Sequence, residues 1–133
     1  MPDFRLASLG GAELSRAELA GKVVLYDFWA TWCGPCHIQA DILRKAYPAL
    51  QARGIEIVGM ATGEPPEVVR DFASRRPFPW PVLVDPEESV SGELDVLGLP
   101  TMVITDREGK IAFRQTGIVT ADRIERELAK LAG

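Results

Sequence analysis

The segment Trp32-Cys33-Gly34-Pro35-Cys36 is the most informative part of the sequence for the fold, because it stands where an expected buried strand is followed by an expected helix. Residues 22–30 come before it and hold a continuous apolar run, which is typical of a central strand covered on both faces. After it we expect a helix over residues 34–53. Gly54 follows at the position where a helix commonly ends with a left-handed residue.

The spacing of the two cysteines predicts redox chemistry. A helix start offers free N–H groups and the positive end of the helix dipole, which favour a thiolate at Cys33. Two intervening residues place Cys36 one helical turn on, close enough for a small disulfide. Gly34 relaxes the turn, and Pro35 fixes φ where no N–H is needed.

Two structural interpretations compete with the redox one. A closed zinc site needs four ligands, and the chain offers only Cys33, Cys36 and His37 before carboxylates. His37 directly follows Cys36, so on a helix it points about 100° away from it. Inert, buried cysteines suit Cys36 alone but not the whole Cys-Gly-Pro-Cys unit. The pattern therefore disfavours a metal site.

The rest of the chain alternates strands and helices and closes with a hairpin and a helix. In the N-terminal part we expect a hairpin around residues 10–11 and a helical turn with a capping box of Ser15 and Glu18. In the middle we expect a strand over 55–60, a helix begun by Pro65 and Pro66, a strand over 82–84, and a helix opened by Pro86 that carries Val90, Leu94 and Leu97. At the end we expect a hairpin of 101–105 with 110–114 and a helix from Thr120 with Ile124, Leu128 and Leu131 facing inward. This order predicts an α/β fold, a mixed central sheet with helices on both faces, in one domain over residues 1–133.

Composition excludes several classes of function. The chain has 133 residues, 47% of them hydrophobic, and a net charge of −4, which favours neither nucleic acid nor an anionic membrane surface. No stretch approaches the roughly 20 apolar residues of a membrane-spanning helix, so we expect no membrane insertion. The opening residues 1–5 lack the pattern of a signal peptide. The protein is therefore expected in the cytoplasm, or outside it if a leader precedes this sequence.

Two motifs carry a resemblance to a known family. Residues 27–36, Asp-Phe-Trp-Ala-Thr-Trp-Cys-Gly-Pro-Cys, resemble the active-site segment of thioredoxin, and residues 98–101, Gly-Leu-Pro-Thr, resemble its cis-proline loop. The opening Pro-Asp-Phe, residues 19–24, an extra segment around 81–86 and residues 106–110 resemble the longer thioredoxin-like proteins of the TlpA/ResA type. The resemblance implies a thioredoxin fold with a central strand–helix insertion.

The resemblance also implies roles for individual residues. Cys33 matches the exposed nucleophile, which attacks a substrate disulfide, and Cys36 matches the resolving thiol. Asp27 matches a buried acid that exchanges a proton with Cys36, and burial should raise its pKa toward neutrality. Trp29 and Trp32 match the active-site tryptophans.

A second group of residues is expected to contact substrate. Pro100 would be cis and would leave the backbone of Leu99 free to pair with an extended client. Trp32, Gly34 and Pro35 would form the surface around the disulfide.

The sequence departs from its relatives at four points. Asp41 stands where a helix proline is usual, so we expect a weaker kink. Gln39 replaces an acidic residue that is usual in TlpA-type proteins, whereas Asp27 stands where they often have Asn. Residues 55–62 contain no lysine to pair with Asp27, as thioredoxin has.

The family implies an enzyme that reduces disulfides in client proteins. It would work as a monomer without metal, flavin or nucleotide, and an upstream reductase would recharge it. A peroxiredoxin would need Pro-x-x-x-Thr-x-x-Cys, but Tyr26 and Ala30 occupy those positions before Cys33. A copper carrier on this fold would want three residues between the cysteines and a distant histidine, whereas His37 is the only histidine.

Overall fold

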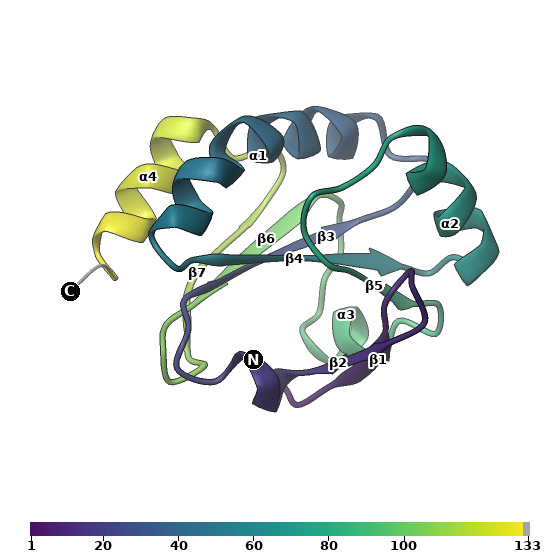
Figure 1. Ribbon diagram of the computed structural model, residues 1–133, viewed down its shortest axis with the longest axis horizontal. Coiled ribbons are helices and arrows are strands. Elements are labelled where there is room, and N and C mark those ends of the chain that lie inside the picture. Colours follow the sequence, from purple (N-terminus) through teal and green to yellow (C-terminus); the bar gives the residue numbers. More distant parts are fainter. Residues whose placement is uncertain (132–133) are drawn as a thin grey trace.

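A five-stranded sheet forms the centre of the protein, seen in a computed structural model that describes residues 1–131 (Figure 1). The strands lie in the order β5-β4-β3-β6-β7. Neighbouring strands β3, β4 and β5 are parallel, and β6 runs antiparallel to both β3 and β7. Their bounds are β3 Val24–Trp29, β4 Glu56–Thr62, β5 Val82–Asp85, β6 Thr101–Thr105 and β7 Ile111–Thr116.

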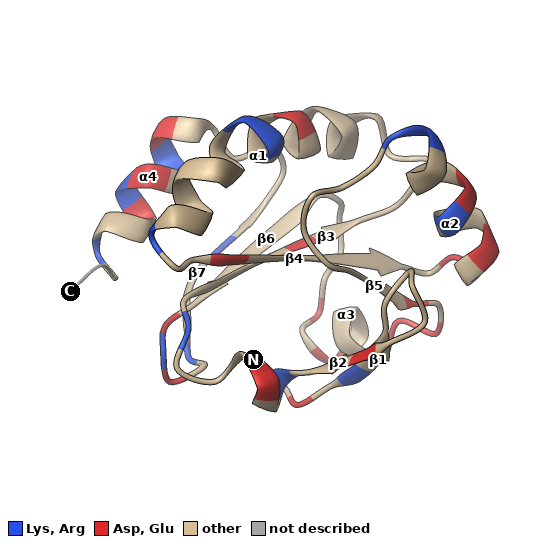
Figure 2. Ribbon diagram, viewed as in Figure 1, with Lys and Arg blue, Asp and Glu red and all other residues tan. Residues whose placement is uncertain are grey.

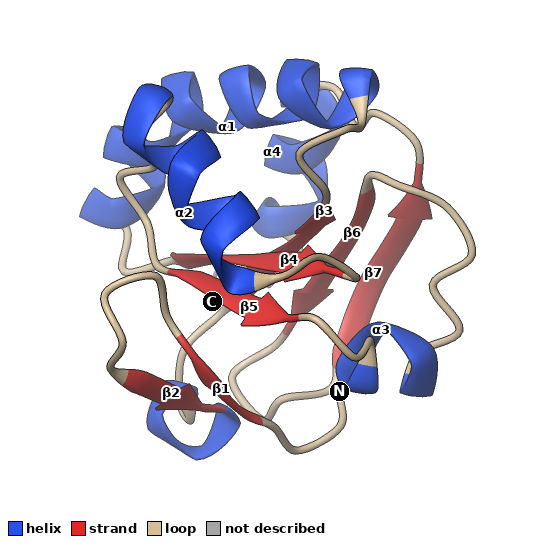
Figure 3. Ribbon diagram, turned by 90° about the vertical axis from the view of Figure 1, so that its right-hand side faces the viewer, coloured by secondary structure: helices blue, strands red, loops and turns tan. Residues whose placement is uncertain are grey.

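Helices cover both faces of this sheet, as predicted (Figures 1 and 3). One face carries the three longer helices: α1 Gly34–Ala52, α2 Pro66–Arg75 and α4 Ala121–Ala129. The other face carries the short helix α3, Ser89–Glu93, and the N-terminal hairpin of β1 Arg5–Ala7 and β2 Glu13–Ser15, which leads into the 3-10 helix η1, Arg16–Leu19. The thioredoxin-like fold is therefore confirmed, including its N-terminal hairpin.

The central strand β3 separates two apolar cores. Leu25 and Trp29 belong to the core beneath α1, α2 and α4, whereas Tyr26 and Phe28 belong to the core beneath α3 and the N-terminal hairpin. Successive side chains of a strand point to opposite faces, so Asp27 lies on the α1 side with Leu25 and Trp29. All six residues of β3 are buried, which confirms the prediction of a strand covered on both faces.

Several residues predicted to begin or end helices do so in the structure. Gly54 follows α1 with φ of +77°, in the left-handed region that favours glycine. The Thr120 hydroxyl accepts the Arg123 N–H at 3.2 Å and so caps α4. The Ser15 N–H donates to the Glu18 carboxylate at 3.3 Å at the start of η1.

The helix expected from Pro86 is shorter and begins later than predicted. Asp85 is the reason, because its buried carboxylate accepts the N–H groups of Ser89 at 2.9 Å and Val90 at 2.9 Å. This cap at the end of β5 starts α3 at Ser89, after a turn in which Glu88 is left-handed. Leu97 lies beyond the helix and is 94% exposed, so its predicted place on the helix is wrong.

Charged residues of both signs are interspersed on α2 and α4 (Figure 2). Within residues 1–131, no helix is both long enough and apolar enough to cross a bilayer.

Candidate active site

Cys33 and Cys36 form a disulfide where β3 passes into α1. Their Cα atoms are 5.2 Å apart. Cys33 is the N-cap of α1, and its Sγ accepts the N–H of Cys36 at 3.2 Å. The helix start therefore offers a hydrogen-bond donor to the first sulfur, and Pro35 stands in the first turn where no N–H is needed.

The exposure of Cys33 differs from the expectation of an exposed nucleophile. Cys33 is only 3% exposed and Cys36 1%, so both sulfurs are buried in the disulfide form. The N-cap conformation turns the side chain of Cys33 back toward the helix, where its sulfur meets both the N–H and the sulfur of Cys36. Trp32 is 73% exposed, and Gly34 and Pro35 are exposed as well. These three residues form the accessible surface around the disulfide.

Asp27 is a buried acid of β3, on the same side of the sheet as α1. Its exposed fraction is 2%, and its Oδ1 has no hydrogen-bond partner among the residues described. Desolvation by burial raises the pKa of Asp27 to about 7. The expected shift toward neutrality is confirmed, and it comes from burial without a neighbouring lysine.

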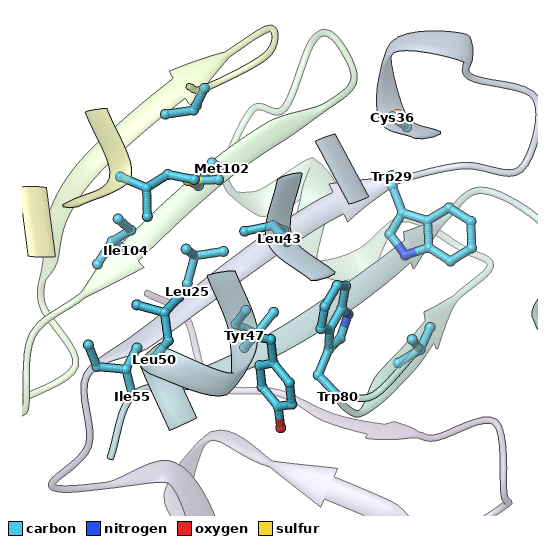
Figure 4. Packing of buried hydrophobic residues seen from close by; sticks show 14 of the residues in the cluster. Leu25, Trp29, Cys36, Leu43, Tyr47, Leu50, Ile55, Trp80, Met102 and Ile104 are labelled. Carbon is cyan, nitrogen blue, oxygen red and sulfur yellow. The ribbon is translucent and has the colours of Figure 1, made fainter. Parts of the chain in front are cut away.

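The indole rings of Trp29 and Trp80 lie close to Gly59, which neighbours this acid on the adjacent strand. A Cβ atom at Gly59 would lie 3.3 Å from Nε1 of Trp29 and 3.4 Å from Nε1 of Trp80. Gly59 pairs with Asp27 in the register of β3 and β4, so both indole nitrogens lie close to the strand position that neighbours the acid. Figure 4 shows Trp29 and Trp80 in the same cluster as Cys36. Sequence reasoning missed Gly59 and Trp80, although a glycine inside a strand signals such a close approach.

The cis-proline loop lies beside the end of β3. The Leu99–Pro100 bond is cis, as predicted. Thr101 pairs with Phe28, so the loop runs alongside the turn that carries Cys33. The Pro100 carbonyl accepts the N–H of Gly117 at 2.8 Å, whereas no backbone hydrogen bond involves Leu99 within residues 1–131.

Gln39 ties α1 to the loop before α4. Its side chain is fully buried, donates from Nε2 to the Val119 carbonyl at 3.1 Å and accepts the Val119 N–H at 2.7 Å. An amide matches this pair of groups because it carries one donor and one acceptor end. The departure from an acidic residue at this position therefore has a structural reason.

No group of three or more His, Cys, Asp or Glu side chains is placed to hold a metal ion within the part of the chain that the structure describes. The disulfide is the redox group of the site.

Comparison with known proteins identifies the family. A sequence profile of the Redoxin family matches residues 1–131. The chain belongs to the Redoxin family. Among curated relatives, the chain is 35% identical over 130 residues to the thiol-disulfide oxidoreductase ResA of Geobacillus kaustophilus, covering 98% of this chain and 75% of the relative. It is 32% identical over 123 residues to ResA of Bacillus subtilis, covering 92% and 69%.

Solved structures agree with this assignment. A Chlorobium tepidum protein described as a candidate thiol:disulfide interchange protein, DsbE, superimposes with a TM-score of 0.91 at 28% identity. The match covers 99% of this chain and 94% of the Chlorobium tepidum chain. The protein is therefore a thiol–disulfide oxidoreductase, and Cys33 and Cys36 supply its redox-active pair.

Proposed function

We propose that the protein works as a reductant of disulfides in client proteins, with Cys33 as nucleophile and Cys36 as resolving thiol. The observation that carries the assignment of roles is the N-cap position of Cys33, whose sulfur accepts the Cys36 N–H. A donor aimed at the sulfur stabilises its thiolate, which is the attacking form. Cys36 lies inside the helix, is 1% exposed and is bonded to the sulfur of Cys33, which suits a resolving thiol.

The reaction takes two exchange steps. The Cys33 thiolate attacks one sulfur of the client disulfide, forms a mixed disulfide and releases the other client sulfur as a thiolate. Asp27 accepts the proton of Cys36, whose thiolate then attacks Cys33, forms the Cys33–Cys36 disulfide and releases the second client thiolate. Two electrons pass from the pair to the client. An upstream dithiol reductase, as donor, restores the reduced pair.

Asp27 suits this proton transfer because its pKa of about 7 lies near the working pH of a general base. The proposed docking surface combines Trp32, Gly34 and Pro35 with the backbone of Leu99 before Pro100. An extended client segment would pair with Leu99 as an added strand. The protein would act as a monomer and need no further cofactor.

The test is insulin reduction with dithiothreitol as electron source. Cys33→Ser should abolish turnover, because no nucleophile remains. Cys36→Ser should instead accumulate mixed disulfides with insulin, visible on non-reducing gels, because nothing resolves them. The double serine variant is the matched control and should do neither. Full turnover by Cys33→Ser would overturn the assignment of roles.

A further inference from the structure

Thr31 stands at the centre of the turn that presents the nucleophile. The Cys33 N–H donates to the Ala30 carbonyl at 3.3 Å and closes a turn over residues 30–33. Thr31 and Trp32 are its two central residues, between the buried end of β3 and the first sulfur. The position of Cys33 therefore depends on what holds Thr31.

Glu64 binds Thr31 from the segment between β4 and α2. Its carboxylate accepts the Thr31 N–H at 2.7 Å and also accepts the Thr31 hydroxyl. Glu64 is only 9% exposed and follows β4, whose end lies beside that of β3 because the two strands are parallel. A buried carboxylate with two hydrogen bonds is strongly held in place.

His37 binds the remaining polar group of Thr31 from the helix. Its Nε2 lies 2.9 Å from the Thr31 carbonyl. A carbonyl only accepts, so Nε2 is the donor in either charge state of the ring. The ring also stacks on Phe72 of α2, with centroids 5.1 Å apart and planes 29° apart, which fixes its orientation.

The N–H, the carbonyl and the hydroxyl of Thr31 are thus all bound by two side chains that sequence reasoning did not assign to the reaction. We propose that Glu64 and His37 are positioning residues, which hold Thr31 so that Cys33 meets the client disulfide in one geometry. The inference rests on the proposed function of Cys33 as nucleophile. A displacement of about 1 Å at a reacting atom costs on the order of 100-fold in rate.

The test compares Glu64→Ala with Glu64→Gln in insulin reduction. Loss of both hydrogen bonds in Glu64→Ala should lower kcat/KM at least about 10-fold. Glutamine is isosteric, and its oxygen can accept the Thr31 N–H while its amide donates to the hydroxyl. Glu64→Gln should therefore stay within about threefold of the unmodified protein. Glu67→Ala removes an exposed acid one turn away and is the matched control, with no expected change.

The Gln variant separates positioning from charge. If negative charge near the site were the contribution of Glu64, Glu64→Gln would behave like Glu64→Ala, and that result would overturn the proposal. A Glu64→Ala variant with the kcat/KM of the unmodified protein would also overturn it. Urea unfolding of each variant shows whether it is folded under the assay conditions. If Glu64→Ala does not fold, Thr31→Val, which loses only the hydroxyl, should lower kcat/KM about threefold or more, and an unchanged value would overturn the proposal.

His37→Phe tests the second contact. Phenylalanine keeps a ring to stack on Phe72 but has no N–H for the Thr31 carbonyl, so kcat/KM should fall about three- to tenfold. An unchanged value would remove His37 from the proposal.

Oxidised glutathione serves as a second substrate, and its reduction by each reduced variant is followed by stopped flow. Failure of the unmodified protein to reduce insulin would count against the proposed function. The ratio between Glu64→Ala and unmodified rates with glutathione would still test the positioning role, and a ratio near one would contradict it.

Discussion

Asp27 lies directly beside Gly59 in the parallel register of β3 and β4, so the neighbouring strand places no side chain against its carboxyl group. On its other side β6 offers Met102, which is apolar. No cationic side chain on the two neighbouring strand positions offsets the negative charge of Asp27. Burial alone therefore raises the pKa of its carboxyl group to about 7. A group with a pKa near 7 can bind and release a proton around neutral pH, as the proposed exchange with Cys36 requires.

The raised pKa of Asp27 predicts that the free energy of unfolding is lower at high pH than at low pH. The ordinary pKa of an aspartate side chain is 3.8, and the pKa of Asp27 in the folded protein is about 7, so between these pH values the folded state binds more protons than the unfolded state. Stability should therefore fall as pH rises from about 4 to about 7 and stay lower above. A shift of this size corresponds to on the order of 4 kcal/mol at 1.36 kcal/mol per pH unit.

Asp27→Asn should remove that cost. Its free energy of unfolding in urea should exceed that of the unmodified, oxidised protein by about 2–4 kcal/mol at pH 8 and match it near pH 4. Asp122→Asn, at an exposed position in α4, is the control and should change stability by less than about 1 kcal/mol. An equal gain at both pH values would mean that titration of Asp27 is not the cause.

Alkylation of the reduced protein should distinguish the two cysteines. Cys33 at the N-cap should react with iodoacetamide much faster than Cys36 near pH 6, because the helix start favours its thiolate. Peptide mapping by mass spectrometry after a short pulse measures the ratio. Because both residues are nearly buried in the disulfide form, comparable labelling of the two would show that access rather than thiolate stability governs the rate.

We expect the Cys33–Cys36 pair to have a low reduction potential, as disulfide reductants such as thioredoxin have. Gly34 and Pro35 have no side chain that donates a hydrogen bond to a thiolate, and Asp27 disfavours negative charge on sulfur once ionised. His37, which could have stabilised a thiolate, instead directs Nε2 at Thr31. We expect a value within about 50 mV of the −270 mV of thioredoxin, measured by titration against glutathione. A value above about −200 mV would contradict this account and favour an oxidase or isomerase.

Gln39→Glu should destabilise the protein at neutral pH. A carboxylate cannot donate to the Val119 carbonyl, which Gln39 reaches with its amide, and the site is fully buried. We expect a loss of about 2–4 kcal/mol in urea unfolding at pH 8, which should shrink at pH 4, where a protonated acid can donate. The same change at exposed Gln51 of α1 is the control and should cost less than about 1 kcal/mol.

The local signals in the sequence were sufficient for much of the fold. The strand before Cys33, the helix after it and the caps at Gly54 and Thr120 depend on neighbouring residues, and all are confirmed. The predicted start of α3 at Pro86 is wrong. The helix begins at Ser89 instead, because the carboxylate that caps it comes from Asp85 at the end of a strand.

The part of the site that sequence reasoning missed depends on contacts between distant segments. Glu64 meets Thr31 across 33 positions, and Trp80 meets Gly59 only through the pairing of strands. Neither contact leaves a periodic pattern, and the single glycine in the strand indicates a close approach without identifying Trp80 as the partner. The burial of Cys33 was missed for a similar reason, because its exposure depends on the direction of one side chain at the turn.

The N-terminal hairpin has a consequence for self-association. Ser8 bridges Leu83, and the Leu9 N–H donates to the Val82 carbonyl at 3.1 Å, so the segment after β1 occupies the outer edge of β5. An open edge strand with apolar side chains is a template on which another chain can add. Residues 8 and 9 therefore cover part of the outer edge of β5 and leave less of it open for pairing with another chain, a structural contribution separate from the chemistry of the disulfide.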